Sequence, residues 1–237
     1  MSSPPGPASA PGLGSPPSPA GAAELSLNLG SFLPRSRVNG PGERAVLWLQ
    51  GCPLRCPGCY NPALLPVKDA ARFPVGVVAE VIKAIPDIEG VTYSGGEPTM
   101  QAAALAALSE TLHAAGLSVV CYTGHVYEHL LAGADPAVVA LLRQVDLLID
   151  GPFERGKAPG GRWRGSANQR LIALSERYRD LAGHAGQDLS DEREVEVIVA
   201  DGAALWTGVF PAEIPRRVQA LLADRSRPRA GTRRVAR

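Results

Sequence analysis

Residues 45–62 read AVLWLQGCPLRCPGCYNP, an apolar run of strand length followed by three cysteines within eight positions. A continuous apolar run is typical of a strand buried on both faces, as in a parallel sheet. Cys52, Cys56 and Cys59 lie on the loop after this strand. Metal sites use four protein ligands, or three and an open position, so a fourth ligand must come from elsewhere.

Strand and helix patterns alternate on both sides of this stretch, which predicts an α/β fold. Repeated βα units favour a mainly parallel sheet with outer helices, open or partly closed like an incomplete (β/α) barrel. The predicted strands are 25–32 (as an edge strand), 45–50, 90–94, 117–123, 145–150 and 193–200, and the predicted helices are 77–85, 100–116, 126–133, 136–144 and 211–225.

Length and composition predict a single domain with two appendages. Residues 1–24 are rich in Pro, Ser, Gly and Ala and are expected to be disordered, whereas residues 225–237 carry six arginines and form a basic tail. The domain is expected to span residues 25–224. A formal net charge of +1 and the lack of an apolar run of about 18 residues argue against nucleic acid and membrane as partners. A cytoplasmic location is the default expectation.

Each unusual motif follows a predicted strand. GGEPT starts at Gly95, YTGH at Tyr122 and DGPFERG at Asp150. Parallel α/β folds bind ligands at the carboxyl ends of their strands. We therefore expect these loops to meet the cysteine loop over one mouth.

The spacing of the cysteines favours an iron–sulfur cluster over zinc. Structural zinc would require a fourth Cys or His at short spacing, and the next ones, His113 and Cys121, belong to no paired motif. Cys121 lies in an apolar strand and is expected to be a core residue. A [4Fe–4S] cluster with one iron left for an external ligand is the remaining option.

The C-x3-C-x2-C loop resembles the signature of radical S-adenosylmethionine (radical SAM) enzymes. The resemblance implies a fold of the incomplete (β/α) barrel type, with SAM bound to the open iron through its methionine moiety. It also implies that Gly95, Gly96 and Glu97 contact the methionyl amino group. The two glycines allow close backbone approach and the carboxylate can accept from an amine. Taken alone, this motif would be read as a turn before a helix.

A narrower resemblance links the chain to the activating enzymes of anaerobic ribonucleotide reductase. It rests on WLQGCPLRCPGCYNP, SGGEP, YTG, LLIDGPF and WRGSANQR in this order. The resemblance implies that a 5′-deoxyadenosyl radical generates a glycyl radical on the reductase, with a flavodoxin- or ferredoxin-type electron donor. No catalytic side chain is expected beyond the cluster and SAM. Gly58 stands where many radical SAM proteins have an aromatic residue, so Tyr60 is the residue expected to line the nucleoside.

The same resemblance implies that Thr123, Asp150, Arg164, Ser166 and Asn168 contribute to the SAM site. Two alternatives stay open at this point. Asp150 before Gly-Pro is equally read as a turn residue. The WRGSANQR stretch is also read as a polar loop with Ser166 as the N-cap of a helix.

Two further functions stay open as well. A radical SAM protein of this subfamily could act on another protein or on a small molecule. A non-catalytic metal-binding or electron-transfer module would hold its metal with the three cysteines plus Cys121 or a histidine, and would bind no SAM.

Overall fold

The computed structural model describes residues 25–158, 160–182, 194–200 and 203–209. The predicted tails and the whole of the predicted helix over 211–225 therefore concern residues outside this part of the chain. Within the described residues, no helix is both long and apolar enough to cross a membrane. The helices are α1 (Val75–Lys83), α2 (Ala102–Ala114), α3 (Tyr127–Ala132), α4 (Pro136–Leu142) and α5 (Arg179–Ala182), with the short 3₁₀ helices η1 (Pro62–Leu64), η2 (Pro98–Gln101), η3 (Arg155–Lys157) and η4 (Glu176–Tyr178).

A mixed sheet of seven strands, in the order β3-β1-β2-β4-β5-β6-β7, forms the centre of the molecule. Its strands are β1 (Ser26–Ser36), β2 (Arg44–Leu49), β3 (Ala71–Pro74), β4 (Gly90–Gly95), β5 (Ser118–Tyr122), β6 (Leu147–Asp150) and β7 (Arg170–Ala173). The four central strands β2, β4, β5 and β6 pair in parallel, as predicted. The outer strands pair antiparallel, and β1 is not at the edge, because β3 pairs along its far side.

The two faces of the sheet pack against different partners. On β2, Leu47 and Leu49 join the core that α1, α2 and α4 cover, whereas Val46 and Trp48 point to the opposite face. This alternation follows from the two-residue period of a strand. Helix α1 faces the core through residues at helical spacing, namely Val75, Val78, Ala79 and Ile82.

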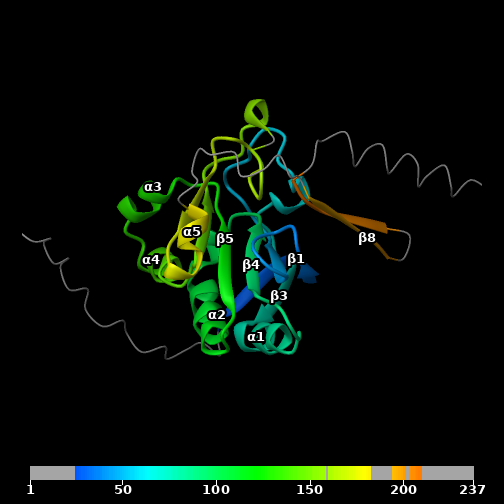
Figure 1. Cartoon of the computed structure of the whole chain (residues 1–237), viewed down its shortest axis with the longest axis vertical. Helices are drawn as coiled ribbons and strands as arrows, with labels where there is room; N and C mark the ends of the chain where they lie inside the picture. The colour runs from blue at the N-terminus through cyan, green and yellow to red at the C-terminus, as the bar shows by residue number, and fades with distance from the viewer. Residues whose placement is uncertain (1–24, 159, 183–193, 201–202, 210–237) are drawn as a thin grey trace, which may run out of the picture.

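The opposite face is covered by loops and a hairpin instead of long helices. Trp163 and Tyr178 pack on β5 and β6, and Ile198 packs beside Trp48. The long loops after β2 and β6 extend beyond the same end of the sheet (Figure 1). These loops surround a cleft at the carboxyl ends of the parallel strands.

The predicted strand over 193–200 forms, but the expectation that it belongs to the parallel sheet is wrong. It is β8 (Val195–Ala200), which pairs antiparallel with β9 (Ala203–Gly208) in a separate two-stranded sheet. This hairpin is orange in Figure 1. The pairing of Ala200 with Ala203 leaves a two-residue connection, and its sequence, Asp-Gly, is the pair that favours such hairpins.

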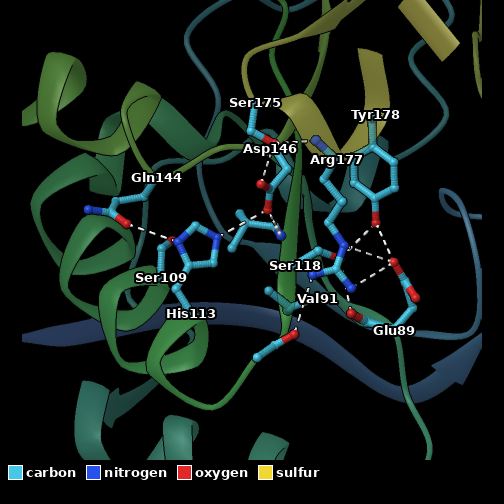
Figure 2. A network of polar contacts seen from close by, with 12 residues as sticks. Glu89, Val91, Ser109, His113, Ser118, Gln144, Asp146, Ser175, Arg177 and Tyr178 are labelled. Atoms are coloured by element: carbon cyan, nitrogen blue, oxygen red, sulfur yellow. Dashed lines mark hydrogen bonds and ion pairs between the residues drawn. The ribbon is translucent and has the colours of Figure 1, made fainter. Parts of the chain in front are cut away.

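A buried arginine ties the strands together at the amino end of the sheet, opposite the cleft. Arg44 is fully buried and donates to the hydroxyls of Thr92, Ser118 and Tyr178, and to the carbonyls of Pro41, Val91 and Ser118. Burial lowers the pKa of its guanidinium. The hydroxyl of Tyr178 also donates to Glu89, which accepts from Arg177 (Figure 2).

A second carboxylate extends this network across the sheet. Asp146 accepts from the Ser175 hydroxyl at 2.6 Å and from the Val119 backbone N–H at 2.8 Å. It also lies 3.1 Å from His113 Nε2 (Figure 2). The aspartate thus links the serine, the backbone of β5 and the histidine, and the group acts as a structural tie.

Replacing Arg44 with methionine is expected to lower the free energy of unfolding by about 3–5 kcal/mol. The change leaves buried carbonyl and hydroxyl acceptors without a donor. Chemical denaturation of the apo protein measures the effect, and Arg143→Met, at an exposed position on the same protein, is the matched control. Equal stability of the two variants would show that the network carries little of the fold's stability.

Candidate iron–sulfur site

The cysteine loop leaves β2 and is held at both ends by backbone hydrogen bonds. The N–H groups of Gly51 and Cys52 donate to the carbonyls of Leu64 and Leu65 at 2.9 and 3.1 Å. A turn closes between Cys56 and Cys59, with the N–H of Cys59 donating to the carbonyl of Cys56 at 3.1 Å. Cys52 is buried and the other two cysteines are partly exposed. All three line one cleft.

The expected convergence of loops over one mouth is confirmed. The segments after β2, β4, β5 and β6 all contribute to the cleft. Of the predicted site residues, those that line it are Cys52, Cys56, Cys59, Tyr60, Gly95, Gly96, Glu97 and Thr123.

The cysteine geometry differs from that of a site for a single ion. Among the residues that the structure describes, no three His, Cys, Asp or Glu side chains are gathered closely enough to hold one metal ion. A cubic cluster places each thiolate on a different iron, so its ligands stand further apart than those of zinc. Burial raises the pKa of the Cys52 and Cys59 thiols, and binding to iron would deprotonate them. Three thiolates on one loop match the ligand set of a [4Fe–4S] cluster with one open iron.

The turn after β4 packs directly on the backbone of the cysteine loop. A Cβ on Gly96 would lie 2.1 Å from the Gly51 carbonyl oxygen, and one on Gly95 would lie 2.5 Å from the Leu49 nitrogen. Gly95 also has a φ of +99°, which favours glycine. In this structure, the two glycines therefore let the turn pack closely on the strand and loop that lead to Cys52.

The Glu97 carboxylate is buried and accepts hydrogen bonds from the protein on both oxygens. Oε1 accepts from the N–H and hydroxyl of Thr99 and from the Thr123 hydroxyl, at 3.1, 2.8 and 2.9 Å. Oε2 accepts from the Gly124 N–H at 2.9 Å. The Glu97 backbone N–H donates to Gly51 at 2.8 Å. Glu97 therefore joins the loops after β2, β4 and β5, and Thr123 is part of this junction.

Tyr60 brings three of the sequence motifs into contact. Its ring packs edge-on against Phe153 of the DGPF motif, with the ring centres 5.0 Å apart. A Cβ on Gly165 of the WRGS motif would lie 3.2 Å from the Tyr60 ring. Burial raises the pKa of the Tyr60 hydroxyl. These contacts form an aromatic wall at the side of the cleft beside the cysteines.

Asp150 does not line the cleft, because its carboxylate is buried between two structural elements. It accepts from Arg170 at 2.9 and 2.5 Å and from the Tyr127 N–H at 2.8 Å. These contacts join the end of β6 to β7 and to the start of α3. Arg170 also binds Glu128, whose pKa these hydrogen bonds lower. The geometry favours the structural alternative for Asp150.

Arg164, Ser166 and Asn168 also lie away from the cleft lining. The buried hydroxyl of Ser166 accepts from the Glu154 N–H at 3.0 Å, and Asn168 donates to the Pro152 carbonyl at 2.8 Å. The three residues thus belong to the loop that holds the DGPF segment. Arg164 Nε and Asn168 Oδ1 are buried without a hydrogen-bond partner among the described residues. Their contact with SAM stays a prediction.

One wall of the cleft was not predicted from the sequence. Trp206, Thr207 and Val209, from β9 and the residue after it, line the cleft, as does Asn39 after β1. The Asn39 amide donates to the Thr207 hydroxyl at 2.7 Å, which fixes this wall to the sheet. Asp-Gly between two apolar runs was the available signal for the hairpin, but nothing local indicated where it docks.

A family model described as "4Fe-4S single cluster domain" matches residues 38–172, more than half of the chain. The match spans the cysteine loop and every motif described above.

Known relatives identify a narrower family within the proteins that carry such a cluster domain. The "Anaerobic ribonucleoside-triphosphate reductase-activating protein" of Vibrio cholerae is 33% identical over 60% of this chain and 96% of its own length. That of Escherichia coli is 32% identical over the same shares. QueE from Escherichia coli overlaps in structure with 44% of this chain and 55% of its own, at a TM-score of 0.35 and 17% identity. The two sequence relatives and the cluster domain show that the chain belongs to the family of anaerobic ribonucleoside-triphosphate reductase-activating proteins.

Replacing Gly96 with alanine is expected to destabilise the protein by about 1–3 kcal/mol and to lower its iron content after reconstitution. The added methyl group meets the Gly51 backbone and must displace the start of the cysteine loop. Gly76→Ala is the matched control, because a Cβ there has no neighbour within 4 Å and alanine suits the interior of α1. Unchanged stability and iron content in Gly96→Ala would show that the cysteine loop can move to accommodate the methyl group without loss of stability or of cluster binding.

Replacing Glu97 with glutamine is expected to lower the stability of the apo protein by about 2–3 kcal/mol. The amide puts an N–H₂ group where the protein presents only donors. Denaturation without metal or SAM measures this, with Glu110→Gln on the exposed face of α2 as control. Unchanged stability of the apo protein, together with weaker SAM binding by the loaded protein, would show that the carboxylate binds SAM and does not hold the loops together.

Proposed function

We propose that this protein is a radical SAM activating enzyme that generates a glycyl radical on an anaerobic ribonucleotide reductase. One observation carries the proposal. The three cysteines and the turn with Gly95, Gly96 and Glu97 line a single cleft, and the turn packs on the residue before Cys52. Membership of the activating-protein family supports the same function.

In this proposal Cys52, Cys56 and Cys59 bind three irons of a [4Fe–4S] cluster, and SAM occupies the fourth. The bound cluster supplies the electron that splits SAM into methionine and a 5′-deoxyadenosyl radical, which removes a hydrogen atom from a glycine Cα of the partner. Tyr60 lines the nucleoside, and the backbone around Gly95 and Gly96 faces the methionine.

The remaining residues hold this arrangement and keep water out. Glu97 and Thr123 fix the relative position of three loops through buried hydrogen bonds. Tyr60, Phe153 and Trp163 line the cleft with aromatic rings, which shield a reactive radical from solvent. Arg164 and Asn168 carry buried polar atoms that the described protein leaves unpartnered, which suits a role in holding SAM.

Several finer features complete the proposal. Residues 25–224 form one radical SAM domain of the incomplete (β/α) barrel type, whose open side admits the glycine loop of the partner. The electron comes from a flavodoxin- or ferredoxin-type protein. The cytoplasm is the proposed location, since free thiols that bind a cluster require a reducing compartment.

The test is performed without oxygen on protein reconstituted with iron and sulfide. Added SAM and dithionite are expected to yield 5′-deoxyadenosine in the parent protein and in Cys121→Ala, but not in Cys56→Ala. Cys121 is a suitable control because it is buried in β5 and does not line the cleft. Addition of the reductase from the same organism should then give the electron paramagnetic resonance (EPR) signal of a glycyl radical.

Each negative outcome points to a different alternative. A loaded cluster without SAM binding or 5′-deoxyadenosine would indicate an electron-transfer module. Loss of the metal in Cys121→Ala would indicate that Cys121 is the fourth ligand. Production of 5′-deoxyadenosine without a radical on the reductase would indicate another substrate.

A further inference from the structure

Arg155 packs against the cysteine loop at Gly58. A Cβ on Gly58 would lie 2.7 Å from Arg155 Nε and 3.1 Å from its Cζ, so the guanidinium lies directly over Gly58. Gly58 stands between Cys56 and Cys59. Neither Gly58 nor Arg155 is among the described residues that line the cleft, so their contact lies outside the cleft lining.

The segment that carries Arg155 is held in place by the loop that follows it. The N–H of Glu154, directly before Arg155, donates to the fully buried Ser166 hydroxyl at 3.0 Å. The N–H of Ala167 donates to the Lys157 carbonyl at 2.8 Å. Both contacts lie within two residues of Arg155, so its backbone is fixed although its side chain is exposed.

The positive charge of Arg155 is not neutralised by an ion pair within the described part of the chain. Its neighbour Lys157 pairs with Glu154 at 2.7 Å. Two other charges lie close to the cysteines. Arg55 is exposed on the loop itself, and the negative charge of Glu97, on the inner side, contributes to the raised pKa of Cys52.

We propose that Arg155 raises the reduction potential of the cluster through the electrostatic effect of its guanidinium, an inference that rests on the proposed cluster ligation. Three thiolates on a 2+ core give a net charge of −1, and one electron from an external reductant makes it −2. A fixed cation beside the loop stabilises the more negative state. Arg155 therefore makes it easier for the donor to deliver the electron.

The backbone conformation favours glycine at position 58. Gly58 has a φ of +78°, which disfavours other residues, and a Cβ there would also require the exposed Arg155 side chain to move. The arginine thus takes the space that an aromatic side chain before the last cysteine would need. Tyr60, one residue beyond Cys59, provides the aromatic surface instead.

The test is a redox titration of the reconstituted cluster with dithionite, followed by EPR spectroscopy at constant ionic strength. Arg155→Gln is expected to lower the equilibrium constant for reduction about tenfold, which equals about 59 mV for one electron. Arg155→Lys keeps the charge and should stay within about threefold of the parent. Lys157→Gln removes a charge from the same short helix, but this charge is already paired with Glu154. It should change the equilibrium constant for reduction less than about twofold.

Two results would overturn the proposal. One is a cluster in Arg155→Gln that has the same reduction potential as the cluster in the parent protein. This holds also if the variant lowers the melting temperature of the apo protein. The other is an equal shift in Arg155→Gln and Lys157→Gln, which would indicate general surface charge. The titration requires only a bound cluster, so its outcome does not depend on whether the protein cleaves SAM.

Discussion

The backbone of Gly51 is the point on which both the fold and the site depend. Its carbonyl accepts from the Glu97 N–H at 2.8 Å, and the Cα of Gly96 packs against it. Strands β2 and β4 pair in parallel up to Leu49 and Gly95, so the carboxyl ends of these two strands lie at the same level. A chain that leaves β2 at this point must turn over the end of β4. The cysteine loop and the glycine turn are therefore assembled by the same contact that ends the two strands.

Two buried charges, Glu97 and Arg44, lie at opposite ends of the parallel strands, and both are satisfied by neutral groups. At the cleft end the Glu97 carboxylate receives hydroxyl and backbone donors, and at the other end the Arg44 guanidinium donates to hydroxyls and carbonyls. Neutral partners compensate a buried charge only when several are well placed. Each charge thus holds several segments in one arrangement, since a shift of any of them would leave it unsatisfied.

The sequence predicted the parts of the molecule whose signals are local. The strands β2, β5 and β6 contain apolar runs, β4 is a short strand segment with the sequence GVTYSG, and the motifs after these strands meet where parallel strands end. Strand β3 is short and exposed at every position, so no apolar pattern marked it. The partners of Asp150 and Ser166 lie on segments that only the folded chain brings close, Arg170 and Glu154. The hydrogen bonds of these two residues hold loops together, as the structural alternatives predicted, and the SAM contacts that the resemblance implies stay a prediction.

The position of the β8–β9 hairpin in the chain has a consequence for how one wall of the cleft can change. The residues that match the cluster-domain family end at 172, whereas the wall formed by Trp206 and Thr207 lies well beyond that point. Among the described residues, the wall is attached through the pairing of Thr207 with Asn39 and through the packing of Ile198 beside Trp48. The cysteine loop and this wall of the cleft therefore lie in separate stretches of the chain. Substitutions in the hairpin can change the wall while the cysteine loop keeps its sequence.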